Sequence, residues 1–286
     1  MLTLLFDGIA YGMLLFVLAV GLAVTLGLMN FINLAHGAFA MAGGYTTVLL
    51  MERAGVPFLA TLPIAFVLVG ALGALAERTL YRPMYSKPHL DQVLFSIGLT
   101  FMAVASVDYF IGSQQQIIQL PAYLQGRFDL EFVGIGKYRL FIIVVCGVLT
   151  LALQWILSCS RFGSRLRASV DDPRVAQGLG INVNRVFLLT FAVGSGLAGL
   201  GGALGADVLG LDPTFPLKFM IYFLIVVSVG GTTTITGPLL AALLLGVADV
   251  FGKYYVPKLG AFIVYTLMIV ILSLRPQGLF GRAATR

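Results

Sequence analysis

The sequence has very little charge. Only 10% of its 286 residues are Asp, Glu, Lys or Arg and 59% are hydrophobic, whereas a soluble domain carries about 25% charged residues. Long windows lack charge altogether, namely 8–51, 54–76, 92–107, 140–160, 186–206, 219–248 and 259–274. Most of them can hold one or two membrane-spanning helices of roughly 20 residues. The composition therefore excludes a soluble domain and predicts an all-α polytopic membrane protein.

Cysteines and the motifs of common enzymes are also scarce. The two cysteines, Cys146 and Cys159, lie on one predicted helix, too far apart for a disulfide, and suggest no metal site. The sequence has no G-x-x-x-x-G-K-[ST] phosphate loop, no G-x-S-x-G elbow and no H-E-x-x-H pair. We therefore expect neither catalysis nor a bound cofactor or metal in this chain.

The charge-free windows predict about eight or nine transmembrane helices in a single domain, residues 1–286. The first apolar stretch contains Asp7 and continues too far for a signal peptide, so we interpret it as the first span. The window 219–248 is too long for one helix, and its centre reads GGTTTITGP. We predict a pair of short or interrupted helices there, within 219–250. The predicted helices are 8–28, 34–51, 57–76, 92–111, 140–158, 186–206, 219–229, 237–250 and 259–274.

Basic residues cluster in three segments between the predicted spans. Residues 77–91, 159–185 and 275–286 hold eleven of the eighteen lysines and arginines. A chain that starts outside and crosses as predicted places all three segments on one face, and basic loops are typical of the cytoplasmic face. The net charge of +6 therefore indicates topology rather than nucleic-acid binding, although Arg127, Lys137 and Arg139 lie on the opposite side.

Two polar interruptions stand out within the apolar windows. The first contains Asn30, Asn33 and His36, where Asn can cap the backbone N–H groups of a following helix. The second, at 230–238, follows Ser228 and contains Gly230, Gly231, Thr232 and Thr234. Transporters often place interrupted helices in corresponding positions of two halves around a substrate path. Two interpretations stay open at both places: polar groups that line a translocation path, or groups that only satisfy local backbone.

The glycine-rich stretch GSGLAG, residues 194–199, fits G-x-G-x-x-G. A dinucleotide site would need a preceding strand and a later acidic residue, and a hydrophobic helix offers neither. Together with LGGALG at 200–205 and DGIAYG at 7–12, it predicts close packing of helices through small residues.

The loop 159–185 contains RASVDDPRVAQGLGIN, which predicts a short, capped helix. Asp172 suits the N-cap, Pro173 the first helical position and Gly180 the C-terminal cap. Val175, Ala176 and Leu179 are expected on one face, with Arg174 and Gln177 elsewhere. Such a helix rests on lipid headgroups or docks into a groove of a cytoplasmic partner.

The chain resembles the LivH-type permease subunits of branched-chain amino acid ABC importers. The resemblance is carried in family order by GLMNFINLAHGAFAMAGGY, DDPRVAQGLGINVNRV, FAVGSGLAGLGGAL and LRPQGLFG. Asn33 and His36 match the family's Asn-x-x-His, and Gly230 and Gly231 match its late Gly-Gly turn. The threonines that follow depart from the glycine-containing continuation that is usual there.

This resemblance implies an inner-membrane complex in a bacterial cell. Its other members would be a second permease of LivM type, two ATP-binding subunits that bind the ATP, and a periplasmic substrate-binding protein. The segment that would contact an ATP-binding subunit contains Asp171, Asp172, Pro173, Arg174, Gln177 and Gly180. The substrate would be a branched-chain amino acid or a related solute such as urea, an amide or an aromatic acid.

Two other functions stay possible on the residues alone. An ion-coupled secondary transporter usually has a buried acidic residue, and Asp108 and Asp249 are the nearest candidates. A passive channel for a small polar solute would use the polar interruptions as a filter, but it has no need of the capped helix in the arginine-rich loop. We therefore expect the permease subunit of an ATP-driven importer.

Overall fold

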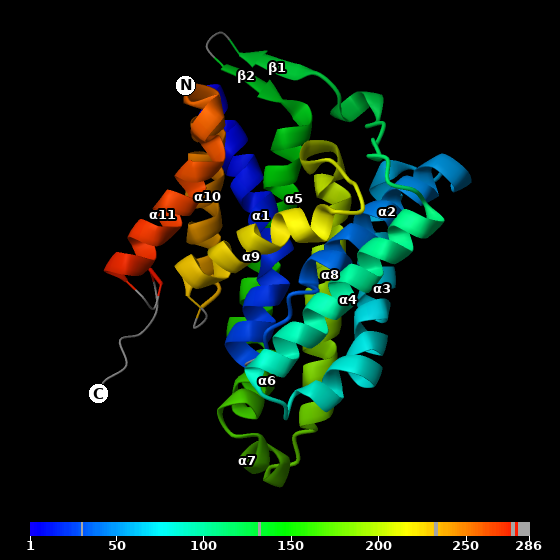
Figure 1. Cartoon of the computed structure of the whole chain (residues 1–286), viewed down its shortest axis with the longest axis vertical. Helices are drawn as coiled ribbons and strands as arrows, with labels where there is room; N and C mark the ends of the chain where they lie inside the picture. Colours follow the sequence, from blue (N-terminus) through cyan, green and yellow to red (C-terminus); the bar gives the residue numbers. More distant parts are fainter. Residues whose placement is uncertain (30, 131–132, 232–233, 276–277, 280–286) are drawn as a thin grey trace.

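The computed structural model describes residues 1–29, 31–130, 133–231, 234–275 and 278–279, and this part of the chain is almost entirely helical (Figure 1). Six helices are long and apolar enough to cross a membrane, and two shorter apolar helices accompany them. Every predicted span has a helix at its position, so the predicted fold class is confirmed. The helices are α1 (Leu2–Met29), α2 (His36–Ala54), α3 (Phe58–Ala76), α4 (His89–Phe110), α5 (Lys137–Cys159), α6 (Arg161–Asp171), α7 (Pro173–Gly178), α8 (Val183–Leu209), α9 (Phe215–Gly230), α10 (Thr236–Tyr255) and α11 (Gly260–Leu274).

Several elements were not predicted. Strands β1 (Arg127–Leu130) and β2 (Val133–Gly136) form an antiparallel hairpin, and a π-helical turn, Glu77–Tyr81, extends α3. Helix α6 precedes the predicted short helix and is capped by Ser160, whose hydroxyl oxygen accepts the Gly163 N–H. Strands of four residues and single helical turns carry too few side chains to show a periodic pattern.

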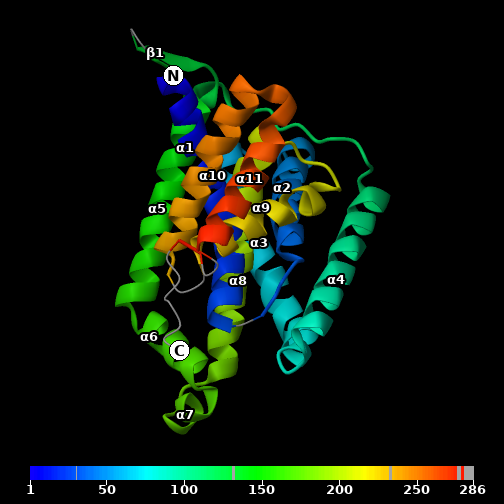
Figure 2. The same cartoon turned by 60° about the vertical axis from the view of Figure 1, so that its left-hand side comes forward.

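The hairpin and the N-terminus lie at one end of the bundle, and α6 and α7 lie at the other (Figure 1). The turn after α3 lies in the same half as α6 and α7, as the predicted crossing pattern requires (Figures 1 and 2). Two basic residues of the hairpin end are held locally: Arg139 forms an ion pair with Asp7 at 3.0 Å, and Lys137 lies over the ring of Phe128. Both of these positive charges at the hairpin end therefore have local partners. They agree with the prediction that the more basic face is the one at the α6–α7 end.

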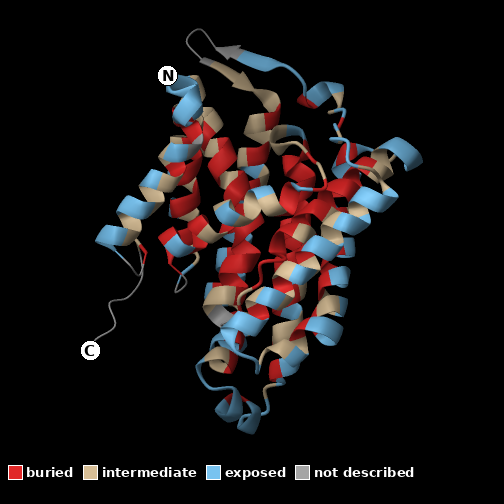
Figure 3. Cartoon of the chain, viewed as in Figure 1, coloured by how far each residue is buried: buried red, intermediate tan, exposed pale blue. Residues whose placement is uncertain are grey.

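Helix α1 runs through the centre of the bundle. It packs against α5, α8, α9 and α10, and its residues Leu14, Leu15 and Leu18 have no exposed surface. Figure 3 shows buried residues concentrated in the middle and exposed ones on the outward helix faces. Many of those exposed side chains are large and apolar, for example Leu94 of α4 and Leu151 of α5, as contact with lipid tails requires.

Glycines allow the central helices to approach one another closely. A Cβ atom on Gly202 of α8 would lie 1.8 Å from the carbonyl oxygen of Ala40 in α2, and one on Gly43 would lie 2.0 Å from the oxygen of Gly199. Gly246 of α10 meets Gly12 of α1 in the same way. The predicted packing role of the glycine-rich stretches is confirmed.

Candidate functional site

The first interruption separates α1 from α2 and lies inside the bundle. We name residues 31–35 the early break; its Phe31 and Asn33 are buried, and it contains no helix. The predicted site residue Asn30 lies outside the described residues. Lipid offers no hydrogen bonds, so unwound backbone at this depth must be satisfied by the protein.

Helix α4 supplies hydrogen bonds to the early break. The Gln92 side chain accepts the Ile32 N–H at 3.3 Å, and the hydroxyls of Ser96 and Thr100 lie 3.5 Å from the carbonyls of Ile32 and Leu34. These three side chains are at most 2% exposed, although most of α4 faces outward (Figure 2). These three residues were not predicted as site residues; the available signal was polar residues at i, i+4 and i+8 in an otherwise apolar span.

Asn33 and His36 are buried but point to different partners. The Asn33 Oδ1 accepts the Ala35 N–H and the Tyr81 hydroxyl, both at 3.1 Å. The His36 Nε2 lies 2.9 Å from the Leu18 carbonyl oxygen in α1; because a carbonyl only accepts, Nε2 carries the proton. Asn33 precedes α2, so it does not extend the helical face that begins at His36. Each side chain connects the early break to a different neighbour.

The turn that carries Tyr81 is held by an ion pair whose carboxylate is buried and whose arginine is partly exposed. The Glu77 side chain has no exposed surface, and its carboxylate accepts from Arg82 Nη2 at 3.0 Å and from the Tyr85 hydroxyl at 3.3 Å. The Gln92 amide then donates to backbone carbonyls on both sides of the turn between α3 and α4. The end of α3, the early break and the start of α4 therefore form one hydrogen-bonded unit. π-helical turns of this kind occur frequently at functional sites.

The second interruption lies between α9 and α10. We name residues 231–235 the late break; Thr232 lies outside the described residues. Gly231 has φ +80° and its N–H donates to the Val227 carbonyl, which ends α9. The Thr234 hydroxyl accepts the Gly237 N–H at 3.3 Å. Only glycine fits at position 237, because a Cβ atom added there would lie 2.1 Å from the carbonyl oxygen of Gly230.

Residues 278 and 279 dock on the end of α9. The Leu279 N–H donates to the Val229 carbonyl at 2.7 Å. Gly278 has φ +80° and is so close that a Cβ atom would lie 2.7 Å from the Ser228 oxygen. The segment thus satisfies a backbone carbonyl that the late break leaves without a helical partner. This contact was not predicted from the sequence.

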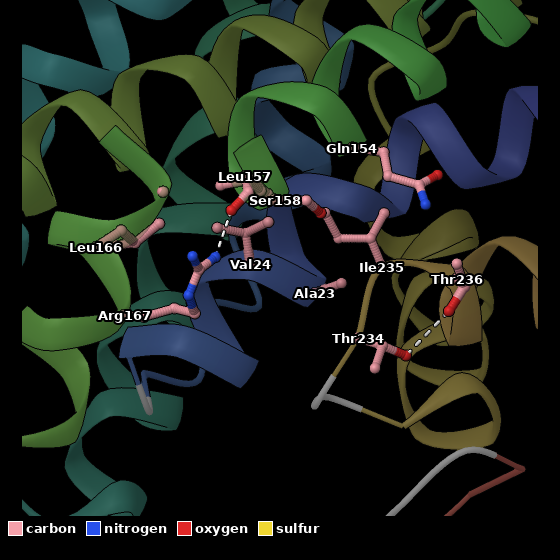
Figure 4. A pocket seen from close by; sticks show the side chains of 11 residues that line it. Ala23, Val24, Gln154, Leu157, Ser158, Leu166, Arg167, Thr234, Ile235 and Thr236 are labelled. Atoms are coloured by element: carbon pink, nitrogen blue, oxygen red, sulfur yellow. Dashed lines mark hydrogen bonds between the residues drawn. The ribbon is translucent and has the colours of Figure 1, made fainter. Parts of the chain in front are cut away.

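A cavity of about 330 Å³ lies beside the late break. Thr234 and Thr236 line it on one side and Arg167 of α6 on the other, where the guanidinium donates to the Leu157 carbonyl (Figure 4). Ser228, Thr234 and Thr236 are exposed on the subunit. These three side chains, in and beside the late break, are therefore accessible from outside the subunit, whereas Asn33 and His36 are enclosed within it.

Helix α7 has the predicted termini. The Asp172 carboxylate accepts the N–H groups of Arg174 and Val175 at 2.8 and 3.0 Å, and the helix begins at Pro173. After the last turn, Gly180 has φ +81°, its N–H donates to Gln177, and the Ile181 N–H donates to the Ala176 carbonyl. This pair of bonds is a Schellman motif.

One detail of α7 differs from the prediction. Ala176 is 1% exposed, whereas Val175 is 58% and Leu179 75% exposed. The three apolar side chains therefore do not share a face: Ala176 packs inward, and the other two project from the end of the molecule. Asp171, at the end of α6, is also exposed.

The chain matches the protein family described as the permease component of the branched-chain amino acid transport system, over residues 4–272. It is 29% identical to the high-affinity branched-chain amino acid transport permease BraD of Pseudomonas aeruginosa, over 97% of this chain and 95% of that protein. It is 27% identical to LivH of Escherichia coli K12, over 97% and 94%. It is also 30% identical to a probable LivH of Methanocaldococcus jannaschii, over 96% and 90%. No solved structure was found to match.

Proposed function

The chain belongs to the family of branched-chain amino acid ABC transporter permeases, and from this premise we propose which partners and substrate it has. It is a multi-pass membrane subunit without catalytic activity, and separate subunits bind the ATP. Its proposed partners are a LivM-type permease, two ATP-binding subunits and a periplasmic binding protein in a bacterial inner membrane. The proposed substrate is leucine, isoleucine, valine or a related small solute.

The exposed end of α7 supports the role of residues 159–185 as the cytoplasmic coupling loop. Two apolar side chains project from a short helix that is fixed at both termini, and such a surface fits a groove of a partner. Asp171 and Arg174 are exposed beside it and would add polar contacts at the rim. Motion of an ATP-binding subunit would reach the bundle through α6, which packs on α5 and α8.

The exposed hydroxyls of the late break support a path along the surface of this subunit. We propose that Ser228, Thr234 and Thr236 face the path, together with Thr232 and the backbone at Gly230 and Gly231. The enclosed residues Asn33 and His36 would hold the early break in shape rather than contact the solute. A path at the surface of one subunit requires the second permease to close it.

The coupling role is tested by replacing the two exposed apolar side chains at the end of α7 with aspartate. Burial of two apolar side chains contributes roughly 3 kcal/mol, so the double variant Val175→Asp, Leu179→Asp should weaken the contact with the ATP-binding subunits on the order of a hundredfold. The measurements are co-purification of those subunits and ATP-driven leucine uptake by the reconstituted complex. Tyr123→Asp, in the segment at the opposite end, is the control. Wild-type uptake by the double variant would refute the coupling role.

A further inference from the structure

A second cavity lies in the half of the bundle that carries the β1–β2 hairpin, which is the outer half in the predicted topology. Its volume is about 450 Å³, within the range of roughly 300 to 1,000 Å³ typical of small-molecule sites. The residues that line it come from the end of α4, the segment that follows, and the connection from α8 into α9: Val104, Asp108, Ser113, Gln115, Asp212, Pro213, Thr214 and Lys218.

The charged groups in this cavity are not balanced. The Asp212 carboxylate forms an ion pair with the Lys218 ammonium group and accepts the Thr214 N–H at 2.8 Å. Asp108, by contrast, has no ion pair and no side-chain hydrogen bond within the described part of the chain. Two carboxylates and one ammonium group leave a formal charge of −1, so the cavity favours a cationic group.

We infer that this cavity binds the ammonium group of a zwitterionic amino acid before it enters the path. Asp108 pairs with the ammonium group, and the Lys218 ammonium group is the donor available to the carboxylate. A zwitterion needs groups of both signs within a few ångströms, and the cavity provides both. The inference rests on the proposed function, because it assumes an amino acid as the substrate.

The test measures binding of radiolabelled L-leucine to the purified permease–ATPase complex in nanodiscs, without the soluble binding protein. Isopentylamine retains the ammonium group and lacks the carboxylate, whereas 4-methylpentanoate retains only the carboxylate. We expect isopentylamine to compete and 4-methylpentanoate to compete much less. Failure of leucine to bind at millimolar concentrations, or equal competition by both analogues, would overturn the inference.

Variants locate the site. Asp108→Asn should weaken leucine binding about tenfold, which corresponds to about 1.4 kcal/mol, and Asp108→Glu should retain most of it. Asp91→Asn, at the other end of α4, is the matched control. Unchanged binding by Asp108→Asn, or an equal loss in the control, contradicts the assignment.

ATP-driven uptake with the binding protein present separates this inference from the proposed function. If the wild-type complex imports leucine but Asp108→Asn binds it as well as wild type does, only the inference is wrong. If the wild-type complex imports no amino acid at all, the proposed function is wrong as well.

Discussion

The contact between α2 and α8 allows a sharp test of the packing, through Gly202→Ala. The added Cβ would lie 1.8 Å from the Ala40 carbonyl oxygen, whereas ordinary contact begins at 3.4 Å. The obstacle is backbone rather than a flexible side chain, so the two helices must separate by roughly 1.5 Å. The same region contains the Gly43–Gly199 contact, so separation at one point also loosens the next.

Two opposing effects decide whether Gly202→Ala raises or lowers the stability of the folded protein. Alanine favours a helix over glycine by about 0.8–1.0 kcal/mol, whereas overpacking a close contact costs about 1–3 kcal/mol and sometimes more. We expect overpacking to dominate at Gly202, because a backbone atom cannot rotate away. With an overpacking cost in the upper part of that range, the net loss should be about 1–2 kcal/mol, a factor of roughly 5–30 in the folding equilibrium.

The assay is thermal unfolding of the purified permease in detergent, compared with Gly98→Ala. Gly98 lies on α4 with no atom within 4 Å of its added Cβ, so only helix propensity acts there. Gly202→Ala should melt below the wild type, and Gly98→Ala should melt at the same temperature or above it. If Gly202→Ala melts as high as Gly98→Ala, the close approach of α2 and α8 is wrong.

Two further predictions concern the breaks. Gln92→Leu removes the partners of the Ile32 N–H and of two carbonyls; at about 0.6 kcal/mol for each bond in a membrane, it should lower stability by roughly 2 kcal/mol in the same melting assay. The control is Ser106→Ala, at an exposed position on the same helix whose hydroxyl bonds only within α4. It should leave the melting temperature unchanged. Equal effects of the two substitutions would contradict the role of α4 in supporting the early break. Gly278→Val places a branched side chain at φ +80°, which costs about 1–2 kcal/mol, and should speed hydrogen exchange of the Leu279 N–H roughly tenfold. Unchanged exchange would show that the segment does not depend on this contact.

The local features of this protein were determined by the sequence itself. A bilayer demands about 20 apolar residues for each crossing, so the charge-free windows located the spans to within a few residues at most ends. The termini of α7 depend on residues within eight positions of one another, which is why Asp172, Pro173 and Gly180 could be assigned their roles. Small residues likewise predicted close helix packing, although not which helices would meet.

The partners across the bundle were decided only by the tertiary structure. Tyr81 reaches Asn33, α4 satisfies the early break, Leu279 reaches Val229, and Asp108 lies in one cavity with Asp212. Each pair is separated by tens of residues along the chain. Helix periodicity states which face of a helix is polar, but the distance between two such faces depends on how the intervening spans pack. The direction in which Ala176 and Val175 point was decided in the same way, by the position of α6 and α8 beneath α7.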